Sequence, residues 1–320
     1  MKNDTNRRLY GYPDMGRTGL GHSLLAWARC VIWCEATGAT MLPPLWLRPR
    51  LGPYLRGERD KREYFKLFRM PALTVLLKRA ALLVFASKTQ SVEGVFKEDI
   101  FNAKFLADNS DRWPAHVVVI NNAMANNEVK FFHFAHGHAP LLRKRFWEMV
   151  KPQYHPKPSA PAIALHVRMG DFSIPSSAAD LKTNNVRLPI QWYVSVLKLL
   201  RRQLGTSFPA IVYSDGSDND LALLLAEPDV KRAPHQESVT DLMSISSAPV
   251  LVASGSGFSL WGAFFGEVPT IHYPGQMKVE ILKDATSTTE NDGTMDLPES
   301  FLNNIQGRLK NSAGSVELST

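Results

Sequence analysis

The chain has 320 residues, of which 44% are hydrophobic, so it can bury a sizeable core without a structural metal or a set of disulfides. Its formal net charge is +7 and its isoelectric point is near 9.4, which favours anionic partners such as nucleotides, acidic glycans or membrane surfaces. The chain has no basic–aromatic RNA-binding signature and no helix-turn-helix pattern, so we predict that nucleic acid is not a partner.

The two cysteines, Cys30 and Cys34, lie four residues apart within an apolar stretch. A metal site would need at least two further ligands nearby, so we interpret both as small buried side chains. With so few cysteines there is no disulfide framework, and a reducing compartment is the expected location.

The N-terminal residues contain no apolar signal core, and no apolar run is long enough to cross a membrane. The longest run, residues 71–86, is interrupted by Lys78 and Arg79, and we interpret it as a core helix or a pair of strands in preference to a membrane-surface helix. We therefore expect a cytoplasmic protein, and we leave open a peripheral contact with a membrane.

In the first half, a glycine-rich loop at residues 16–23 leads into a helix with an apolar face, which Gly38 ends. The other predicted elements of this half are strands at residues 39–44 and 115–120 and a helix at residues 139–150. Residues 151–161 hold four prolines, which makes this stretch the best candidate for a linker between two domains.

The second half alternates strands with helices, which predicts right-handed crossovers and a parallel sheet. The predicted strands are residues 161–168, 209–214, 249–253 and 268–272. The predicted helices are residues 189–204, 218–226, 239–247, 258–265 and 301–310, with a frayed end after the last of them.

Residues 165–173, LHVRMGDFS, end the first of these strands with charged side chains. Arg168 and Asp171 should lie at the carboxyl end of the strand or just past it, at the edge where parallel α/β sheets bind ligands. The planar guanidinium of Arg168 suits a diphosphate, and Asp171 would orient it or take part in proton transfer. The alternative is a plain Arg–Asp salt bridge at the end of a strand.

Three further segments combine small or acidic residues with a predicted helix start. Residues 16–23 (GRTGLGHS) and 254–262 (SGSGFSLWG) either hold an anion at a helix N-terminus or are only a tight turn and a capped helix start. The acidic residues of 213–220 (YSDGSDND) either accept hydrogen bonds from a base or ribose or form an Asx turn and a helix cap. Three of the four segments lie at the carboxyl ends of strands of one predicted sheet, and together they predict a nucleoside-diphosphate site.

These segments resemble the motifs of fucosyltransferases. HVRMGDF resembles the HxRxGDY motif of α-1,2-fucosyltransferases, and residues 241–266 resemble their later Asp-Leu-x-Leu-Met-Ser and Ser-x-Phe-Ser-Trp-Trp segment. GLGHSLL and YSDG are similar to that family's Gly-Leu-Gly-Asn-Gln loop and Ser-Asp-Asp segment. The early stretch from residue 16 through YFKLF is also similar to protein O-fucosyltransferases. The order and spacing of the four segments agree over most of residues 16–273.

The resemblance implies an α/β protein of the GT-B type, with two Rossmann-like domains facing a cleft. The parts would be an acceptor-side domain over residues 1–155, a nucleotide-sugar-binding domain over 156–275 and a partly helical tail over 276–320. The implied reaction is an inverting, metal-independent transfer of fucose, or a related deoxy-hexose, from GDP-fucose to a sugar hydroxyl of a glycan, without a cofactor. A cationic side chain would then replace a metal in stabilising the departing diphosphate.

By the family pattern, Arg168 would hold the β-phosphate of the leaving GDP, and His166 and Asp215 would lie near the guanine or ribose. The full set of implied donor-binding residues is Gly19, Gly21, His166, Arg168, Asp215, Ser256, Phe258 and Ser259. The catalytic candidates are Arg168, Asp171 and His22. The histidines of residues 133–138 are spaced like metal ligands, but no carboxylate or cysteine completes a set, so we assign no metal there.

Several residues depart from the family pattern. His22 stands where the family has Asn, Gly216 where it has a second Asp, and Met169 where a second Arg is common. The imidazole of His22 would act as a general base or only hydrogen-bond substrate or backbone, and Asp171 and Asp14 are rival bases.

These departures leave two other hypotheses open. One is a degenerate glycosyltransferase-like module that binds a nucleotide or glycan without turnover, and the other is a transferase that uses a different nucleotide sugar. The sequence identifies neither the acceptor nor the oligomeric state.

Overall fold

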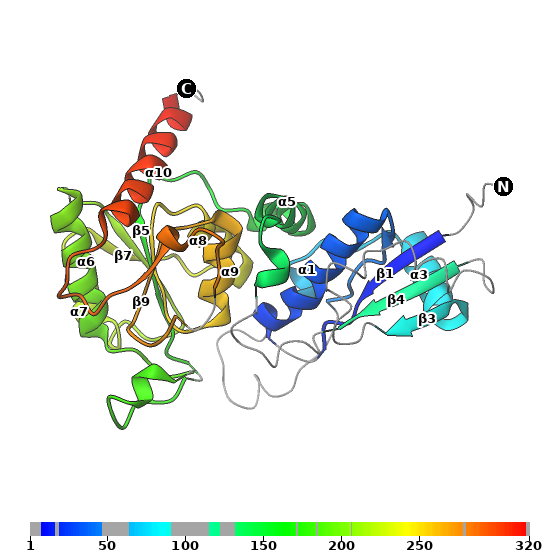
Figure 1. Ribbon diagram of the computed structural model, residues 1–320, viewed down its shortest axis with the longest axis horizontal. Helices are drawn as coiled ribbons and strands as arrows, with labels where there is room; N and C mark the ends of the chain where they lie inside the picture. The colour runs from blue at the N-terminus through cyan, green and yellow to red at the C-terminus, as the bar shows by residue number, and fades with distance from the viewer. Residues whose placement is uncertain are drawn as a thin grey trace. The chain divides into compact units, whose positions relative to one another are not determined.

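We describe the protein from a computed structural model, which covers the ranges 8–16, 19–46, 64–90, 115–121, 132–170, 172–183, 185–205, 207–277 and 280–317. The described residues up to Met149 belong to one compact unit, and those from Val150 onward form a second. Each unit is built on its own parallel sheet with helices packed on it (Figure 1). The predicted α/β class with two Rossmann-like domains is confirmed.

The first unit has a four-stranded parallel sheet in the order β2-β1-β4-β3. Its strands are β1 (Arg8–Pro13), β2 (Thr40–Met41), β3 (Ser87–Gln90) and β4 (Ala115–Ile120). Its helices are α1 (Leu20–Thr37), α3 (Leu73–Phe85) and α5 (Ala139–Met149), with short 3₁₀ turns η1 (Tyr64–Lys66) and η4 (His133–Ala135).

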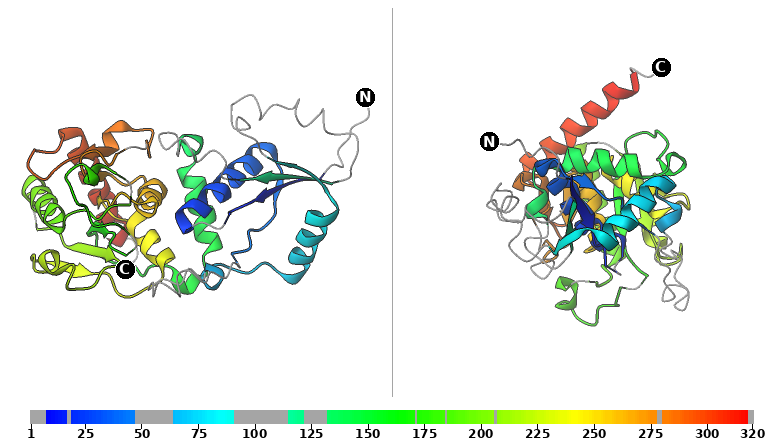
Figure 2. Two further views of the ribbon diagram at one scale, coloured as in Figure 1. Left: turned by 90° about the horizontal axis from the view of Figure 1, so that it is seen from below. Right: turned by 90° about the vertical axis from the view of Figure 1, so that its right-hand side faces the viewer.

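Helices α1 and α3 cover opposite faces of this sheet, as the left view of Figure 2 shows. Successive side chains of a strand point to opposite faces, so β4 contributes alternate valines to the two sides. The buried cluster on the α1 side includes Cys30, Trp33, Cys34, Val118 and Ile120. The cluster on the α3 side includes Tyr10, Leu42, Val117 and Val119, with Leu82 and Leu83 packed against it. Both cysteines are thus buried, as predicted, and burial raises the pKa of the Cys30 thiol.

Helix α3 corrects the interpretation of residues 71–86 as a core element. The segment is a single helix from Leu73 to Phe85, and none of its residues is buried. Only one side of the helix reaches the sheet, through Leu82 and Leu83, because no second layer of described structure covers the opposite side. Among the described helices, none is both long and apolar enough to span a membrane.

The second unit has a six-stranded parallel sheet in the order β10-β9-β8-β5-β6-β7. Its strands are β5 (Ile163–Val167), β6 (Ala210–Ser214), β7 (Val230–Arg232), β8 (Leu251–Val252), β9 (Thr270–His272) and β10 (Thr288–Glu290). Its helices are α6 (Ile190–Leu204), α7 (Ala222–Leu225), α8 (Ser238–Ser246), α9 (Gly257–Gly266) and α10 (Glu299–Glu317). Its 3₁₀ turns are η5 (Pro152–Tyr154), η6 (Asp180–Lys182) and η7 (Ala285–Ser287).

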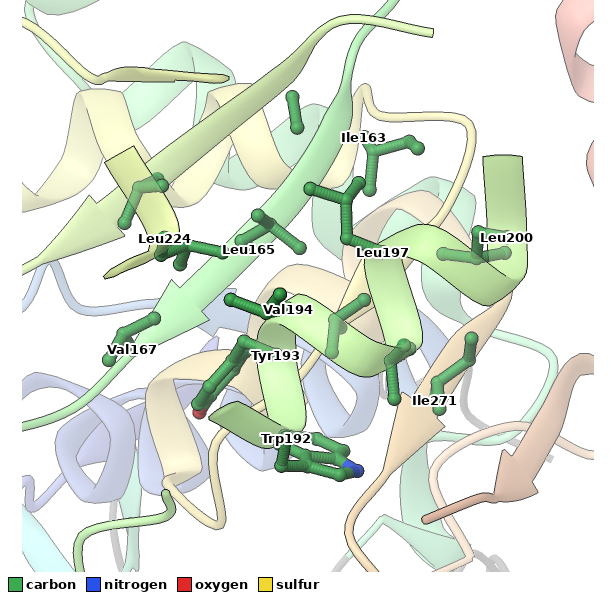
Figure 3. Close-up of a cluster of buried hydrophobic side chains, with 14 of the residues drawn as sticks. Ile163, Leu165, Val167, Trp192, Tyr193, Val194, Leu197, Leu200, Leu224 and Ile271 are labelled. Carbon is green, nitrogen blue, oxygen red and sulfur yellow. The ribbon is translucent and has the colours of Figure 1, made fainter. Parts of the chain in front are cut away.

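The largest described hydrophobic core lies on one face of this sheet (Figure 3). Ile163, Leu165 and Val167 of β5 point into it and meet the apolar face of α6. Phe301 and Ile305 of α10 are buried in the same core, so the last described helix is part of this unit. Since side chains alternate along a strand, Ala164 and His166 of β5 face the other side.

Helix α9 lies on that other side and is fixed at both ends. Ser256 caps its N-terminus, where its side chain accepts a hydrogen bond from the Ser259 amide at 3.3 Å. At its C-terminus, Arg308 of α10 donates to the carbonyl of Gly266 at 2.8 Å and to that of Ala248 at 3.1 Å. A cation at the C-terminal end of a helix also stabilises the helix dipole.

The chain reverses its direction of travel through the second sheet beside β5. From β5 it proceeds to β6 and β7 on one side, and then returns to place β8, β9 and β10 on the other. The crevice at the carboxyl ends of β5 and β8 is therefore a topological switch point, the usual ligand site of open α/β sheets.

Two local predictions are wrong. The helix expected at residues 218–226 spans only Ala222–Leu225, and it is preceded by a turn in which Ser217 and Asp220 hydrogen-bond reciprocally. The segment expected to fray at the end of the chain continues α10 to Glu317.

Helix α9 owes its position to a glycine, which gives a stability test. A Cβ at Gly266 would collide with the backbone carbonyl of Ser246, whereas one at Gly307 in α10 would meet open space. We expect Gly266→Ala to lower the free energy of unfolding by about 3 kcal/mol, since the backbone must move to make room. The matched control Gly307→Ala should raise it by up to about 1 kcal/mol, because alanine favours a helix interior.

Urea denaturation of the three proteins measures both changes. Equal shifts for the two alanine variants would contradict the close packing of α8 and α9.

Candidate functional site

His166, at the carboxyl end of β5, connects this strand to the start of α9. Its side chain is buried, and its Nδ1 atom lies 2.5 Å from Ser259 Oγ and 3.0 Å from Ser254 Oγ. The two hydroxyls are themselves 3.1 Å apart. Strand β5, the turn after β8 and the first turn of α9 therefore meet in one hydrogen-bonded cluster at the switch point.

The same cluster keeps the imidazole of His166 neutral. The pKa of His166 is lowered to about 4, mainly by burial and in smaller part by the positive charge of Arg168 nearby. A neutral imidazole carries one N–H. When Nδ1 accepts a hydrogen bond from a serine hydroxyl, the N–H is therefore on Nε2, which can donate a hydrogen bond. The ring also stands 5.1 Å from the ring of Phe258, so the sequence-predicted residues His166, Phe258 and Ser259 are in contact.

Arg168 follows the end of β5 and is held by Asp215, which follows the end of β6. Arg168 Nη1 lies 2.5 Å from Asp215 Oδ2, and the other carboxylate oxygen accepts a hydrogen bond from the Met169 amide at 2.8 Å. The guanidinium also lies 5.6 Å from the ring centre of Phe172. Asp215 is thus anchored through both oxygens, and it holds the arginine at the carboxyl edge of the sheet.

Gly170 makes this ion pair sterically feasible. A Cβ at Gly170 would collide with Asp215 Oδ2. The sequence RMGD was interpreted as a strand ending, but the glycine is also required so that a carboxylate from the next strand can approach the arginine.

Two departures from the family pattern, Met169 and Gly216, are packed together. A Cβ at Gly216 would lie 2.8 Å from Met169 Cγ, so any larger residue at position 216 would compete with this methionine for space. Gly216 also donates its amide to Ser214 Oγ at 3.0 Å. Met169 and Gly216 are therefore sterically coupled.

Arg232, which sequence analysis did not single out, fixes the turn that carries Asp215. It donates to the carbonyls of Ser214 at 3.2 Å and Gly216 at 2.5 Å, and it is paired with Asp218. Asp218 therefore forms an ion pair and does not cap α7. Arg232 lies at the end of the short strand β7, which the sequence pattern did not reveal.

His272 and Gln276 are two further buried polar residues at the same edge of the sheet. The pairing of β5, β8 and β9 places His272 at the same level as His166, two strands away and on the same face. Within the described chain, His272 Nε2 and Gln276 Oε1 are buried without a hydrogen-bond partner. Gln276 donates to the carbonyl of Thr183 at 2.8 Å, and its Oε1 lies where a Cβ of Gly255 would be. Burial lowers the pKa of His272 to about 4.

In the first unit, the predicted glycine loop follows β1 at the point where the strand order of that sheet also reverses. Gly16 adopts a left-handed conformation with φ 58°, and Gly19 is the N-cap of α1. Gly21 and His22 lie in the first turn of α1, with His22 exposed.

The amide of Leu20 donates to the hydroxyl of Tyr64 at 3.1 Å, so a tyrosine far along the chain satisfies an N-terminal amide of α1. Asp14, one of the rival bases, donates its own amide to the carbonyl of Ile120 at the end of β4.

The other sequence-predicted residues are quickly placed. Asp171 lies outside the described residues. Ser256 belongs to the serine cluster, with its Oγ 3.2 Å from that of Ser254. His133 and His136 have ring centres 5.1 Å apart, but no group of three or more potential metal ligands occurs in the part of the chain that the structure describes.

Comparison with known proteins finds similarity in structure. No family model matches the sequence, and no curated protein matches it. The structure is similar to those of fucosyltransferases. POFUT1 in complex with GDP matches at a TM-score of 0.45 and 14% identity, over 85% of this chain and 100% of that one.

The α-1,6-fucosyltransferase NodZ soaked with GDP-fucose matches at a TM-score of 0.39 and 15% identity, over 84% of this chain and 95% of that one. The structure of NodZ from Bradyrhizobium matches at a TM-score of 0.36 and 15% identity, over 84% of this chain and 95% of that one. At these identities and TM-scores the comparison does not assign a function, so we argue function from the geometry of this chain alone.

The two buried histidines predict how stability depends on pH. Their folded-state pKa of about 4 lies below the ordinary value of 6.5, so between these values the unfolded chain binds protons that the folded chain does not. The contribution of each neutral histidine to the free energy of unfolding is therefore fully present above pH 6.5. It falls by about 3 kcal/mol for each histidine as the pH drops towards 4. We expect His272→Gln to flatten this dependence by roughly half.

Urea denaturation at several pH values between 7 and 4.5 measures the slope. The matched control is Ile271→Val in the same strand, which should lower stability equally at every pH. A slope that is unchanged in His272→Gln would contradict a neutral buried His272.

Proposed function

We propose that the chain is an inverting, metal-independent glycosyltransferase of the GT-B type that transfers fucose, or a related deoxy-hexose, from GDP-fucose to a sugar hydroxyl of a glycan. The observation that supports this best is the position of Arg168 at the switch point of the second sheet, beside a neutral histidine that contacts the start of α9. The resemblance of HVRMGDF and residues 241–266 to fucosyltransferase motifs supplies the reaction class.

The leaving diphosphate would bind at this edge of the sheet. The N-terminus of α9 carries partial positive charge and backbone N–H groups without intrahelical partners. Arg168 would hold the β-phosphate, His166 Nε2 would donate to a phosphate or ribose oxygen, and Ser256 and Ser259 would orient these groups. Asp215 would then act first by positioning Arg168, and by accepting from the ribose or guanine where a ligand displaces the ion pair.

In the proposed reaction, the bond between the sugar C1 and the β-phosphate oxygen breaks, and both of its electrons stay on the phosphate. The acceptor oxygen forms the new bond to C1 from the opposite face, which inverts the configuration. Its proton passes to a base. The charge that develops on the departing GDP is what Arg168 and the helix N-terminus would stabilise, so no divalent cation is needed.

Three residues are candidates for the base, Asp171, His22 and Asp14, and the first two are tested by substitution. Asp171 lies three positions after Arg168 in the sequence, and His22 is an exposed imidazole in the first turn of α1. Gly19 and Gly21 would let the backbone beside His22 approach the substrate. Replacing the base, by Asp171→Asn or His22→Gln, should lower the transfer rate by about 10²–10⁴-fold while changing the Kd for GDP by less than about twofold.

Single-turnover transfer assays, run beside calorimetric titrations of each variant, separate the two candidates. If both variants lose affinity for GDP in proportion to rate, both residues bind the donor and neither is the base.

Removal of Arg168 tests the donor site directly. We expect wild type to bind GDP more tightly than UDP, dTDP or CDP in the presence of EDTA, and Arg168→Ala to weaken GDP binding by roughly 100-fold. Arg168→Lys keeps the charge but loses the planar fork, so its affinity should fall between the two. Arg202→Ala is the matched control, since Arg202 forms an exposed ion pair with Asp296 and its loss should leave the Kd within about twofold.

Isothermal titration calorimetry measures each Kd, and a transfer assay with GDP-fucose follows. A preference for UDP or dTDP would keep the site but overturn the donor. Transfer that stops in EDTA and returns with Mg²⁺ or Mn²⁺ would overturn metal independence. GDP binding without hydrolysis or transfer would favour the hypothesis of a binding module, which the departures at His22 and Gly216 motivate.

A further inference from the structure

The first unit presents an apolar helix surface that its own core does not use. Four outward-facing residues of α3 are strongly exposed: Leu73 at 70%, Leu77 at 62%, Val84 at 67% and Phe85 at 79%. Met70, just before the helix, is 52% exposed. Single exposed apolar residues are common on proteins, but a contiguous group of this kind usually marks an interaction surface.

Helical geometry gathers these side chains on one side of α3. Leu73, Leu77 and Val84 are separated by four and seven residues, which places them on a single stripe, and Phe85 lies next to it. Leu82 and Leu83 point the other way and pack against the sheet cluster of Tyr10, Leu42, Val117 and Val119. Because the sheet already fixes the helix from behind, the outward stripe is held in place as a surface. We call the residues Leu73, Leu77, Val84 and Phe85 the α3 stripe.

The charged residues in the described segment that carries the α3 stripe have one sign. The chain from Tyr64 to Gln90 carries five cationic side chains and no carboxylate. These cations are Lys66, Arg69, Lys78, Arg79 and Lys88. Arg79 reaches back to the sheet, where its guanidinium is 5.1 Å from the ring centre of Tyr12 and its Nε is buried. The other four are exposed, and Lys78 Nζ lies 5.3 Å from the ring centre of Tyr10 beside the helix. Exposed apolar residues on a segment whose described charges are all cationic are the pattern of a helix that lies on an anionic bilayer surface.

We propose that the α3 stripe inserts into the surface of a membrane that contains anionic lipids, with the exposed cations of this segment, Lys66, Arg69, Lys78 and Lys88, against the headgroups. Charge complementarity selects this occupant. A second copy of the chain packed through the same face would bring the two cationic borders together, which is unfavourable. Anionic headgroups would instead attract each cation, while the acyl chains take up Leu73, Leu77, Val84 and Phe85.

This inference does not rest on the proposed transferase activity. The α3 stripe belongs to the first unit, whereas Arg168 and the serine cluster belong to the second, so membrane binding and nucleotide binding are measured separately. If both hold, the lipid surface would concentrate the protein where membrane-bound acceptors are present.

The test is co-sedimentation of the full chain with vesicles. We expect binding to phosphatidylcholine vesicles that contain about one-third phosphatidylserine and little binding to pure phosphatidylcholine. Binding should weaken about tenfold as the ionic strength rises from about 0.05 M to about 0.5 M. The double variant Leu77→Glu/Val84→Glu should lower the partition coefficient by about tenfold or more. The matched control Leu223→Glu replaces a leucine of α7 that is 61% exposed, and it should bind as wild type does.

A second measurement does not depend on those substitutions. An environment-sensitive fluorophore on Leu77→Cys should shift its emission to the blue on anionic vesicles, and the same label on Leu223→Cys should not. The native cysteines are buried, so the label goes to the introduced thiol.

Three results would overturn the proposal. They are equal binding by wild type and the double variant, no blue shift at position 77, and a concentration-dependent dimer that the double variant abolishes while vesicles fail to bind. Titration of GDP into the double variant should give the wild-type Kd, whichever of these results is obtained.

Discussion

The hydrogen bond between His166 Nδ1 and Ser259 Oγ is the contact on which the candidate site depends. It joins β5 to α9 across the point where the strand order reverses, between residues that are 93 positions apart in the sequence. Because the imidazole is buried and neutral, the positive charge next to this bond lies on the Arg168 guanidinium. A cationic histidine there would repel Arg168 and lie poorly solvated, so burial selects the protonation state that the site needs.

A second constraint is steric and comes from glycines. Gly170 leaves room for the Asp215 carboxylate, and Gly216 leaves room for Met169. The pair Met169 and Gly216 replaces charged residues of the motif that the sequence resembles, yet Arg168 retains an anchored carboxylate partner. The change therefore removes polar groups beside the ion pair without removing the ion pair itself. This is the region in which a change of donor or acceptor would be accommodated, since the residues that hold Arg168 are intact.

The alternating pattern of the second half predicted its sheet well because strongly apolar segments such as IALHV and the amphipathic helix α6 leave little ambiguity. The pattern missed β1, which lies inside the first sheet, because RLYGYP mixes glycine and proline with few aliphatic residues. It also missed β7 and β10, which are three residues long and lie at the sheet edges.

The sequence indicated His166, Arg168 and the serine turn, because they adjoin strand ends. It did not indicate Arg232, His272 or Gln276, whose roles arise only from packing between distant segments. The exposed α3 was mistaken for a core element, since composition cannot tell which apolar helix finds a second layer.

Arg308 helps to hold α9 in place before any ligand binds, which affects the entropy of binding. The helix is capped by Ser256 at one end and tied to α10 through Arg308 at the other, and its middle packs against Ile245 of α8 at Gly262. A helix held in this way has little freedom to lose when an anion arrives at its N-terminus. If an anion binds there as proposed, the entropic cost of ordering the amides at the start of α9 is met during folding, before any ligand is present. Affinity at this end of the site would accordingly come from preorganisation, and the adjustments that accompany binding would be confined to side chains such as Arg168 and Asp215.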